Sequence, residues 1–236
     1  MDRKDWDQHV SDLEQVARGE GFQALRDRII ELSRLRRTDR VVDVGSGTGL
    51  LALAAARHAR HVWAVDISPA MTRRLAIEAR RNGLTNVEPI TASAHRLPLA
   101  DASADALISN YCYHHLSDAD KRTALTEARR VLRPGGRLVI GDMMFRVRVS
   151  DSRDRAIIGR AILNMLRRGP AGVLRIAKNA VRYLTGRWEQ PADADWWRQA
   201  LQRAGFRRVD VAPLDHEGGI ATAVNPGVAD GRPGRV

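Results

Sequence analysis

Three closely spaced glycines and a distant carboxylate are the residues best suited to chemistry in this chain. The run VVDVGSGTGL, residues 41–50, places a short apolar stretch before Gly45, Gly47 and Gly49. Glycines at a strand-to-helix turn allow a tight bend and let the backbone approach a ligand without intervening side chains. Asp66 ends the next apolar run, where a carboxylate can accept hydrogen bonds from both hydroxyls of a ribose. These features predict a site for an adenosine-containing ligand.

The glycine spacing separates two kinds of adenosine ligand. A dinucleotide fingerprint requires a glycine at the sixth place of G-x-G-x-x-G, where the helix packs closely under a pyrophosphate. This chain has Leu50 at that place. The spacing therefore disfavours a nicotinamide cofactor, and an oxidoreductase is the less favoured alternative.

Alternating strands and helices must position these residues. Short apolar runs predict strands, and stretches with helical periodicity predict helices between them. The expected strands are 40–44, 61–66, 87–91, 105–110, 137–144, 206–213 and 218–224, and the expected helices are 50–59, 69–82, 119–132 and 192–204, after one or two helices within 5–36. This order predicts an α/β fold, a Rossmann-like, seven-stranded, mostly parallel sheet with an antiparallel last strand and helices on both faces.

Turn and cap residues support these boundaries. Ser68 followed by Pro69 is typical of a helix start, with a side-chain cap and a proline at the first helical position. The run Pro134-Gly135-Gly136 predicts the end of a helix and a turn into the next strand. The five expected parts of the chain are N-terminal helices at 1–37, a cofactor-binding core at 38–145, a basic helical cap at 146–190, the rest of the core at 191–224 and a disordered tail at 225–236.

Four motifs taken together resemble class I S-adenosylmethionine-dependent methyltransferases, in particular the quinone-biosynthesis-like group that acts on small molecules. They are VVDVGSGTGL, VWAVDISPAM, ALISNYCYHHL and LRPGGRLVIGD, and the resemblance covers about residues 38–145 and, more loosely, 190–224. It implies S-adenosylmethionine as the cofactor, methyl transfer as the reaction and S-adenosylhomocysteine as the product. It also implies cofactor contacts from Asp43, Gly45, Ser46, Gly47, Gly49, Asp66, Ile67, Met71, Ser93, Ala94, His95 and Asn110, with Ile67 and Met71 bordering the adenine.

One position departs from the family pattern. Where the family often has an aspartate near the adenine amino group, this chain has Ser93. A serine still accepts a hydrogen bond but contributes no charge. We therefore expect weaker cofactor affinity than in relatives that keep the aspartate.

Two adjacent histidines follow the expected fourth strand and are the candidates for catalysis. His115 and His114 lie where the resemblance places residues next to the transferred methyl group, and a histidine can accept a proton near neutral pH. Two interpretations stand: a base or acceptor-orienting group, or rings that pack against the cofactor or the cap. Asp142, after the fifth strand, is a third candidate. The remaining histidines and the single Cys112 lack metal-ligand spacing, so we expect no metal site.

A basic segment follows the expected fifth strand. Residues 146–187 hold eleven Arg or Lys residues against two aspartates, which is +9 of the net charge of +11. Two apolar stripes, at 157–166 and 173–184, predict two amphipathic helices. In this fold the segment would lie above the carboxyl ends of the strands, so it is interpreted as a substrate cap. Its arginines would bind acidic groups, contact an anionic membrane surface or simply face solvent.

The expected function is methyl transfer to a small, partly hydrophobic metabolite, such as a natural product, a quinone-like compound or a modified peptide. Two alternatives remain, an RNA methyltransferase that uses the basic cap and a cofactor-binding scaffold without catalysis. Trp6 and the N-terminal helix would either close over the cofactor or form an ordinary docked helix. The charged first residues favour a cytoplasmic protein, and the oligomeric state is not predicted.

Overall fold

The computed structural model describes residues 6–9, 19–146, 152–167, 169 and 190–227. Its elements in chain order are η1 (Trp6–His9), α2 (Glu20–Ser33), β1 (Arg40–Val44), α3 (Leu50–Ala56), β2 (His61–Asp66), α4 (Pro69–Arg81), β3 (Val87–Thr91), β4 (Ala104–Asn110), η2 (Tyr113–His115), α5 (Asp118–Val131), β5 (Leu132–Met143), α6 (Ser152–Leu166), α8 (Ala194–Arg203), β6 (Arg207–Pro213) and β7 (Gly218–Val224). Strands and helices alternate as the sequence predicts.

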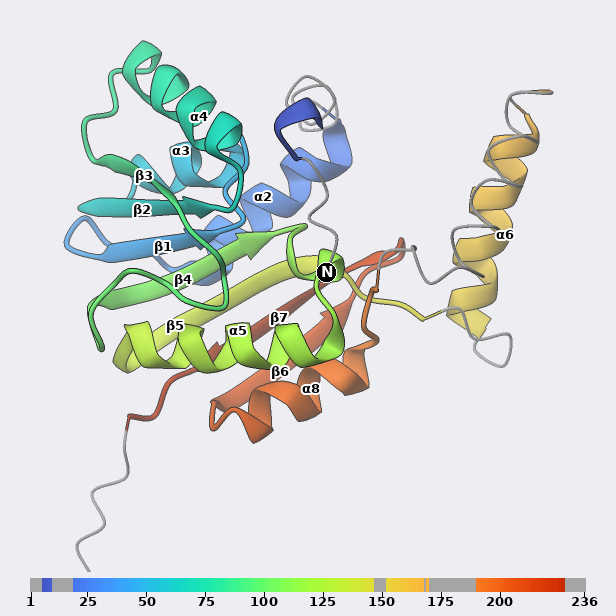
Figure 1. The fold of residues 1–236 in the computed structure, drawn as a ribbon. Helices are drawn as coiled ribbons and strands as arrows, with labels where there is room; N and C mark the ends of the chain where they lie inside the picture. The colour runs from blue at the N-terminus through green and yellow to red at the C-terminus, as the bar shows by residue number, and fades with distance from the viewer. Residues whose placement is uncertain (1–5, 10–18, 147–151, 168, 170–189, 228–236) are drawn as a thin grey trace, which may run out of the picture.

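The strands form one seven-stranded sheet in the order β3-β2-β1-β4-β5-β7-β6 (Figure 1). All neighbouring pairs from β3 to β5 are parallel, whereas β7 pairs antiparallel with both β5 and β6. This confirms the predicted fold class. After β1 the chain builds one side of the sheet, and with β4 it crosses to the other. Ligands of open α/β sheets bind at such a switch point, outside the carboxyl ends of the strands.

Helices cover both faces of the sheet, with one buried apolar cluster on each face. On one face Ile29 of α2, Leu51 of α3 and Leu75 of α4 pack against the strands. On the other face Leu125 of α5 and Trp197 of α8 do the same. Ser68 caps α4 by accepting the N–H of Met71 at 3.1 Å, as the Ser-Pro signal predicts. The two cores hold β1, β2 and β4 in place, and so fix the site at their carboxyl ends.

The strand expected at 137–144 begins earlier, at Leu132. Gly135 has a φ of 77°, and a Cβ on Gly136 would lie 2.8 Å from the carbonyl oxygen of Arg133, so the chain bends at Pro134-Gly135-Gly136 as predicted, although this bend lies inside β5. Pairing with β4 shifts along this stretch, because Ala104 lies opposite Leu132 whereas Ala106 lies opposite Arg137. The proline and glycines therefore mark an irregular part of the strand.

The folded chain continues beyond residue 224, where the tail was expected to begin. Asn225 is buried, and its Nδ2 donates to the carbonyl of Leu132 at 2.6 Å. Its N–H donates to the carbonyl of Gly136 at 2.9 Å. These bonds satisfy carbonyls at the irregular start of β5. The rest of the expected tail, 228–236, lies outside the described residues.

The first cap helix is present as α6, and the second, expected at 173–184, lies outside the described residues. Arg153 anchors α6 by donating to the carbonyls of Met144, Leu214, His216 and Gly218 at 2.8–3.1 Å. The C-terminal half of the helix extends away from the sheet (Figure 1). Ile162 and Leu166, on the predicted apolar stripe, are exposed.

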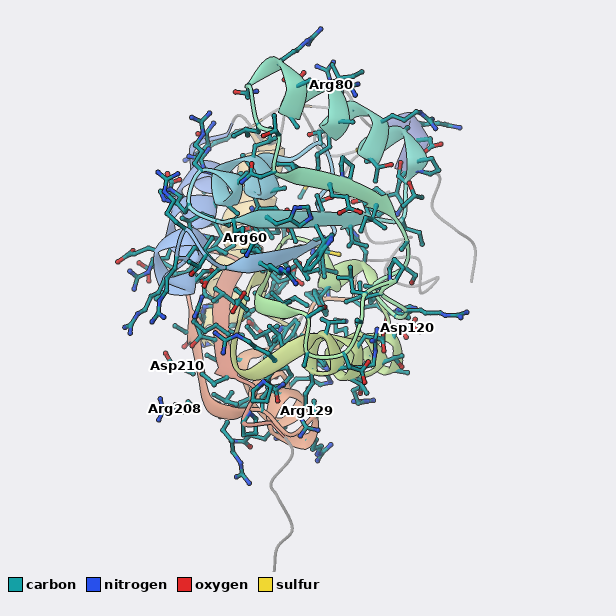
Figure 2. The ribbon with its side chains drawn as sticks, turned by 90° about the vertical axis from the view of Figure 1, so that its left-hand side faces the viewer. Arg60, Arg80, Asp120, Arg129, Arg208 and Asp210 are labelled. Atoms are coloured by element: carbon teal, nitrogen blue, oxygen red, sulfur yellow. The ribbon has the colours of Figure 1, made fainter. Side chains whose placement is uncertain are left out.

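Charged side chains surround the rest of the fold as well. Figure 2 shows Arg80 on α4, Arg129 on α5, Arg208 on β6 and Arg60 in the loop before β2, so basic residues are not confined to the cap. Among the described residues, no helix is long and apolar enough to cross a membrane, and no cluster of three or more His, Cys, Asp or Glu could hold a metal ion. The cytoplasmic localisation stays a prediction.

Candidate cofactor and acceptor site

The glycine loop follows β1 and adopts backbone conformations that favour glycine. Gly45, Gly47 and Gly49 have φ values of 72°, 51° and 105°, in a region that costs other residues steric strain. A Cβ on Gly45 would lie 2.2 Å from the Sγ atom of Cys112, so the loop and the segment after β4 touch here. A Cβ on Gly47 would meet nothing within 4 Å. The backbone is thus packed tightly at one glycine and open at another.

Asp66 connects this loop to the end of β2. Its Oδ2 accepts the N–H of Gly47 at 2.8 Å, and its Oδ1 accepts the N–H of Ser68 at 2.9 Å. Burial raises the pKa of Asp66, and the two N–H bonds oppose that effect. Each carboxylate oxygen has two lone pairs, so both can still accept a hydroxyl. Asp66 is placed to hold the loop and a ribose at the same time.

Asp43, at the carboxyl end of β1, is a buried carboxyl group whose oxygens have no hydrogen-bond partner among the described residues. Burial raises its pKa to about 8, with a smaller contribution from the nearby Asp66. The Oγ of Ser46 and the Oδ1 of Asn110 are also buried without a partner in the described part of the chain. Buried polar atoms normally have partners. Since S-adenosylmethionine offers hydroxyl, amino and adenine donors, these acceptors fit such a ligand.

The residues predicted to border the adenine differ in exposure. Ile67 is 39% exposed at the end of β2, whereas Met71 is buried in α4. Ser93 Oγ accepts the N–H of His95 at 3.2 Å, and the Nε2 of His95 is buried without a hydrogen-bond partner among the described residues. The segment containing Ser93, Ala94 and His95 follows β3, which pairs with β2. The fold therefore brings the expected adenine residues near Asp66, with Met71 inside the core.

His114 is the better oriented of the two histidines. His114 is buried, with 5% of the residue exposed. Its Nδ1 lies 2.6 Å from Oδ1 of Asp142. Its backbone N–H donates to Oδ2 of Asp142 at 2.9 Å. A carboxylate at Nδ1 makes that nitrogen the donor and leaves Nε2 as an acceptor. The structure thus brings two of the candidate residues, His114 and Asp142, together in one buried pair.

His115 has a different environment. It is half-buried, and its ring centroid lies 3.8 Å from that of His114 and 4.5 Å from that of Trp6. Tyr111 adds a further aromatic ring, 6.0 Å from His114 and 4.5 Å from Phe22 of α2. The acceptor side of the site is therefore rich in aromatic rings around one buried imidazole.

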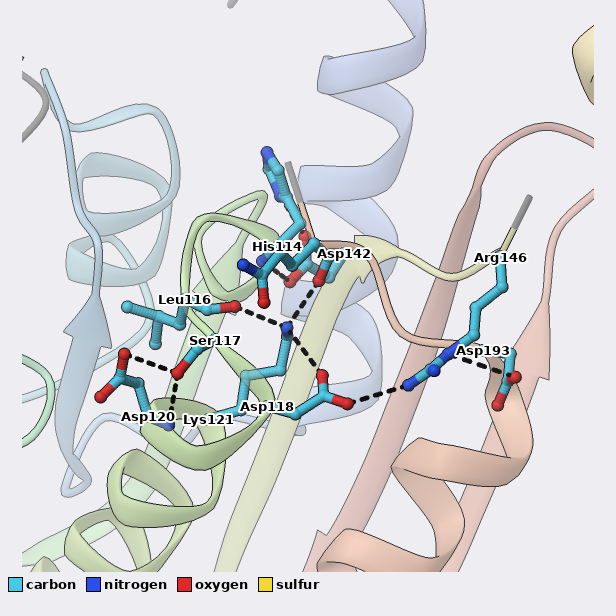
Figure 3. Close-up of polar contacts among 10 residues, drawn as sticks. His114, Leu116, Ser117, Asp118, Asp120, Lys121, Asp142, Arg146 and Asp193 are labelled. Atoms are coloured by element: carbon cyan, nitrogen blue, oxygen red, sulfur yellow. Dashed lines mark hydrogen bonds and ion pairs between the residues drawn. The ribbon is translucent and has the colours of Figure 1, made fainter. Parts of the chain in front are cut away.

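A buried lysine, Lys121, hydrogen-bonds to two residues that adjoin the histidine segment. Lys121 is fully buried, and its Nζ donates to the carbonyls of Leu116 at 2.7 Å and Gln190 at 2.5 Å (Figure 3). The N–H of Gln190 in turn donates to the carbonyl of His114 at 2.8 Å. Burial lowers the pKa of Lys121, although Asp118 opposes this. This network fixes η2 between α5 and the chain entering α8.

Sequence reasoning missed three residues at the site. Tyr111 has a φ of 51°, an unusual conformation for a bulky residue, which turns the chain sharply after β4. Phe22 and Lys121 read as an ordinary core aromatic and an ordinary surface charge in the sequence. The sequence named Asp142 only as a separate candidate and did not predict its pairing with His114.

Comparisons with known proteins agree with this geometry. Residues 41–136 match a family model described as a methyltransferase domain. The chain is 33% identical over 114 residues to the uncharacterized methyltransferase YcgJ of Bacillus subtilis (strain 168), covering 48% of this chain and 44% of that protein. It is 29% identical over 195 residues to the ubiquinone/menaquinone biosynthesis C-methyltransferase UbiE of Vibrio vulnificus (strain YJ016), covering 81% of this chain and 72% of that protein.

A solved structure shows the same fold. The crystal structure of a SAM dependent methyltransferase from Aquifex aeolicus aligns with a TM-score of 0.65 and 19% identity, over 91% of this chain and 97% of that one. The chain spans less than half the length of YcgJ. The region matched by the methyltransferase-domain model, 41–136, contains the glycine loop, Asp43 and Asp66. Over the glycine loop and the sheet, the chain is therefore similar to S-adenosylmethionine-dependent methyltransferases.

Proposed function

We propose that this protein transfers a methyl group from S-adenosylmethionine to a small, partly hydrophobic metabolite, and that His114 accepts the acceptor's proton or orients its nucleophilic atom. The buried His114–Asp142 pair, 2.6 Å apart, carries this proposal. It lies two residues beyond Cys112, which touches the glycine loop at Gly45. A proton acceptor and the proposed cofactor loop are thus neighbours.

The division of labour follows from the chemistry of the cofactor. When bound, S-adenosylmethionine supplies an electrophilic methyl group on a sulfonium whose leaving group is a neutral thioether. The glycine loop and Asp66 then have to hold the cofactor, and the chain after β4 has to align the acceptor. His114 takes up the proton that the acceptor loses, with Asp142 keeping the ring in one orientation.

The surroundings support an acceptor with apolar surface. Tyr111 and His115 present rings to His114, and Trp6 presents its ring to His115. Aromatic rings bury large apolar areas and stack on flat molecules. A flat, partly hydrophobic metabolite with one ionisable oxygen, nitrogen or carbon fits these rings better than a fully polar one.

Incubation of the protein with methyl-labelled S-adenosylmethionine and a panel of hydrophobic metabolites and total RNA tests the proposal. We expect label in an organic-extractable product, and His58→Ala, an exposed histidine after α3, to behave as the wild type. Label in RNA would replace the metabolite with the nucleic-acid alternative. Cofactor binding with no transfer to either class would support the scaffold alternative and contradict the proposal.

We also propose that the cap contacts an anionic membrane surface through α6. Three large apolar side chains are exposed there, Ile162 at 41%, Leu163 at 49% and Leu166 at 49%. By helical spacing, Arg155 and Gly159 lie on the same face of α6 as Ile162 and Leu166, nearer the N-terminus of the helix. The helix with Arg167 carries four arginines against Asp154. Apolar residues flanked by arginines suit a helix that lies in an anionic lipid interface.

Co-sedimentation with lipid vesicles tests this contact. We expect binding to vesicles with anionic lipid, weaker binding to neutral phosphatidylcholine vesicles, and loss of binding in the double variant Leu163→Ser/Leu166→Ser. The matched control is Ile77→Ser, since Ile77 is 38% exposed on α4, a different part of the fold. Equal vesicle binding by the double variant and the control would contradict the membrane contact. It would also be contradicted if the wild type formed a dimer and the double variant did not.

A further inference from the structure

The short N-terminal element η1 makes two contacts that neither the cofactor loop nor the histidine pair explains. On one side, the Oδ1 of Asp7 accepts a hydrogen bond from the Oγ of Ser68. The same oxygen accepts the N–H of Ala70 at 3.2 Å, in the first turn of α4. A carboxylate at a helix N-terminus also meets the positive end of the helix dipole. Asp7 thus holds η1 against the start of α4.

That anchor adjoins the ribose carboxylate. Ser68 donates its N–H to Asp66 at 2.9 Å, and Asp66 accepts the N–H of Gly47 at 2.8 Å. Asp7, Ser68, Asp66 and Gly47 therefore form one continuous series of hydrogen bonds. Any movement of η1 acts on the residue that we expect to hold the ribose.

On the other side, η1 reaches the acceptor half of the site. The Trp6 ring lies 4.5 Å from the His115 ring at an angle of 59°, and His115 lies 3.8 Å from His114. The anchor follows β2 and the ring contact follows β4, and β1 lies between these two strands in the sheet. Four residues, Trp6–His9, thus connect both flanks of the strand that carries the glycine loop.

We propose that η1 is a positioning element for methyl transfer, in which Asp7 fixes the segment beside the cofactor and Trp6 forms a wall of the acceptor site against His115. This rests on the proposed function and adds to it a residue that selects the acceptor. A flat acceptor would be held between Trp6 and the histidine segment. Release of the product cofactor would require the Asp7 contacts to loosen.

Release of S-adenosylhomocysteine, measured by stopped-flow fluorescence, tests the Asp7 anchor without any acceptor. We expect Asp7→Ala to release the ligand about three- to tenfold faster, as the loss of a charge-assisted hydrogen bond implies. Asp7→Asn, which keeps an acceptor oxygen, should release the ligand at a rate between those of Asp7→Ala and the wild type. Asp27→Ala, which removes an exposed carboxylate of α2, should match the wild type. Equal release rates for Asp7→Ala and the wild type would overturn the anchor.

The Trp6 wall has its own readouts. We expect Trp6→Ala to shift the proton NMR signals of the His115 ring and to raise KM for the acceptor more than it lowers kcat, with Trp6→Phe restoring both. Unchanged His115 signals in Trp6→Ala would overturn the ring contact. A shifted His115 signal and unchanged KM would overturn the acceptor role. Because the release and NMR measurements need no turnover, their failure is distinct from a failure of the proposed methyl transfer.

Discussion

The cofactor edge and the acceptor side of this site are built in different ways. The cofactor edge depends on backbone, since three glycines with positive φ and the N–H groups of Gly47 and Ser68 shape it. The acceptor side depends on side chains from separate elements, such as His114 after β4 and Asp142 in β5. A shared cofactor imposes a short local motif, whereas an acceptor is recognised by contacts that a fold can assemble from distant residues.

The sharpest way to separate the two sides is His114→Ala. It should lower the rate of methyl transfer by about 10²–10⁴-fold, the usual contribution of a positioned proton acceptor. The dissociation constant for S-adenosylmethionine should stay unchanged. Initial rates with the identified acceptor, paired with calorimetry, check both. A wild-type rate in this variant would remove His114 from the mechanism.

The converse change is Gly45→Ala on the cofactor edge. Its Cβ would collide with Cys112 at 2.2 Å, and its φ of 72° is strained for alanine. We expect a loss of cofactor binding of about 3 kcal/mol, at the upper end of such strain. Gly21→Ala is the control, because its Cβ would meet nothing within 4 Å. Retained affinity in Gly45→Ala would show that the loop does not need its observed shape.

A smaller effect is expected from Asp66→Ala. Removing the carboxylate should weaken binding of S-adenosylmethionine by about 1–3 kcal/mol through lost charge-assisted hydrogen bonds. The same variant should leave the His114–Asp142 contact intact, because Asp66 and Asp142 lie in different strands, β2 and β5. Calorimetry gives the affinity, and unchanged affinity would remove the ribose role of Asp66.

The smallest effect concerns pH and Asp43. Its folded-state pKa of about 8 lies above the ordinary value of 3.8, so the folded protein holds this proton more tightly than the unfolded chain. The ligand-free protein should therefore lose stability as pH rises from about 4 towards 8. We expect Asp43→Asn to reduce the fall in Tm between pH 6 and pH 8.5 by at least about 3 °C. Identical Tm profiles for the two proteins would contradict the burial of an unpartnered carboxyl group.

The two sides also differ in how far the sequence predicts them. Periodicity predicts where each strand lies, because each strand carries its own apolar run, but it does not give the order of the strands in the sheet. The predicted start of β5 at 137 was wrong, because the strand begins at Leu132 and contains the bend at Pro134-Gly135-Gly136, where Asn225 bonds to neighbouring carbonyls. The motif spacing predicted that Asp66 and the glycine loop belong to one site, and the N–H of Gly47 does donate to Asp66.

The sequence predicted the acceptor side of the site only in part. The sequence favoured His115 over His114. The structure shows His114 as the buried residue, and two adjacent histidines carry no sequence signal of which one is buried. The pairing of His114 with Asp142 depends on the register of β4 and β5, and the contact of Trp6 with His115 joins residues more than a hundred positions apart. The exposure of Ile162 and Leu166 was not predicted either, since periodicity gives the apolar face of a helix but not what covers it.

Calorimetric titration of the wild-type protein with S-adenosylmethionine, S-adenosylhomocysteine and, as the control, NAD tests the central claim most directly. The loop geometry, Asp66 and the buried acceptors of Asp43, Ser46 and Asn110 predict saturable binding of the first two ligands and none of NAD. Binding of NAD in preference to S-adenosylmethionine, or no binding of either sulfur ligand, would contradict the account.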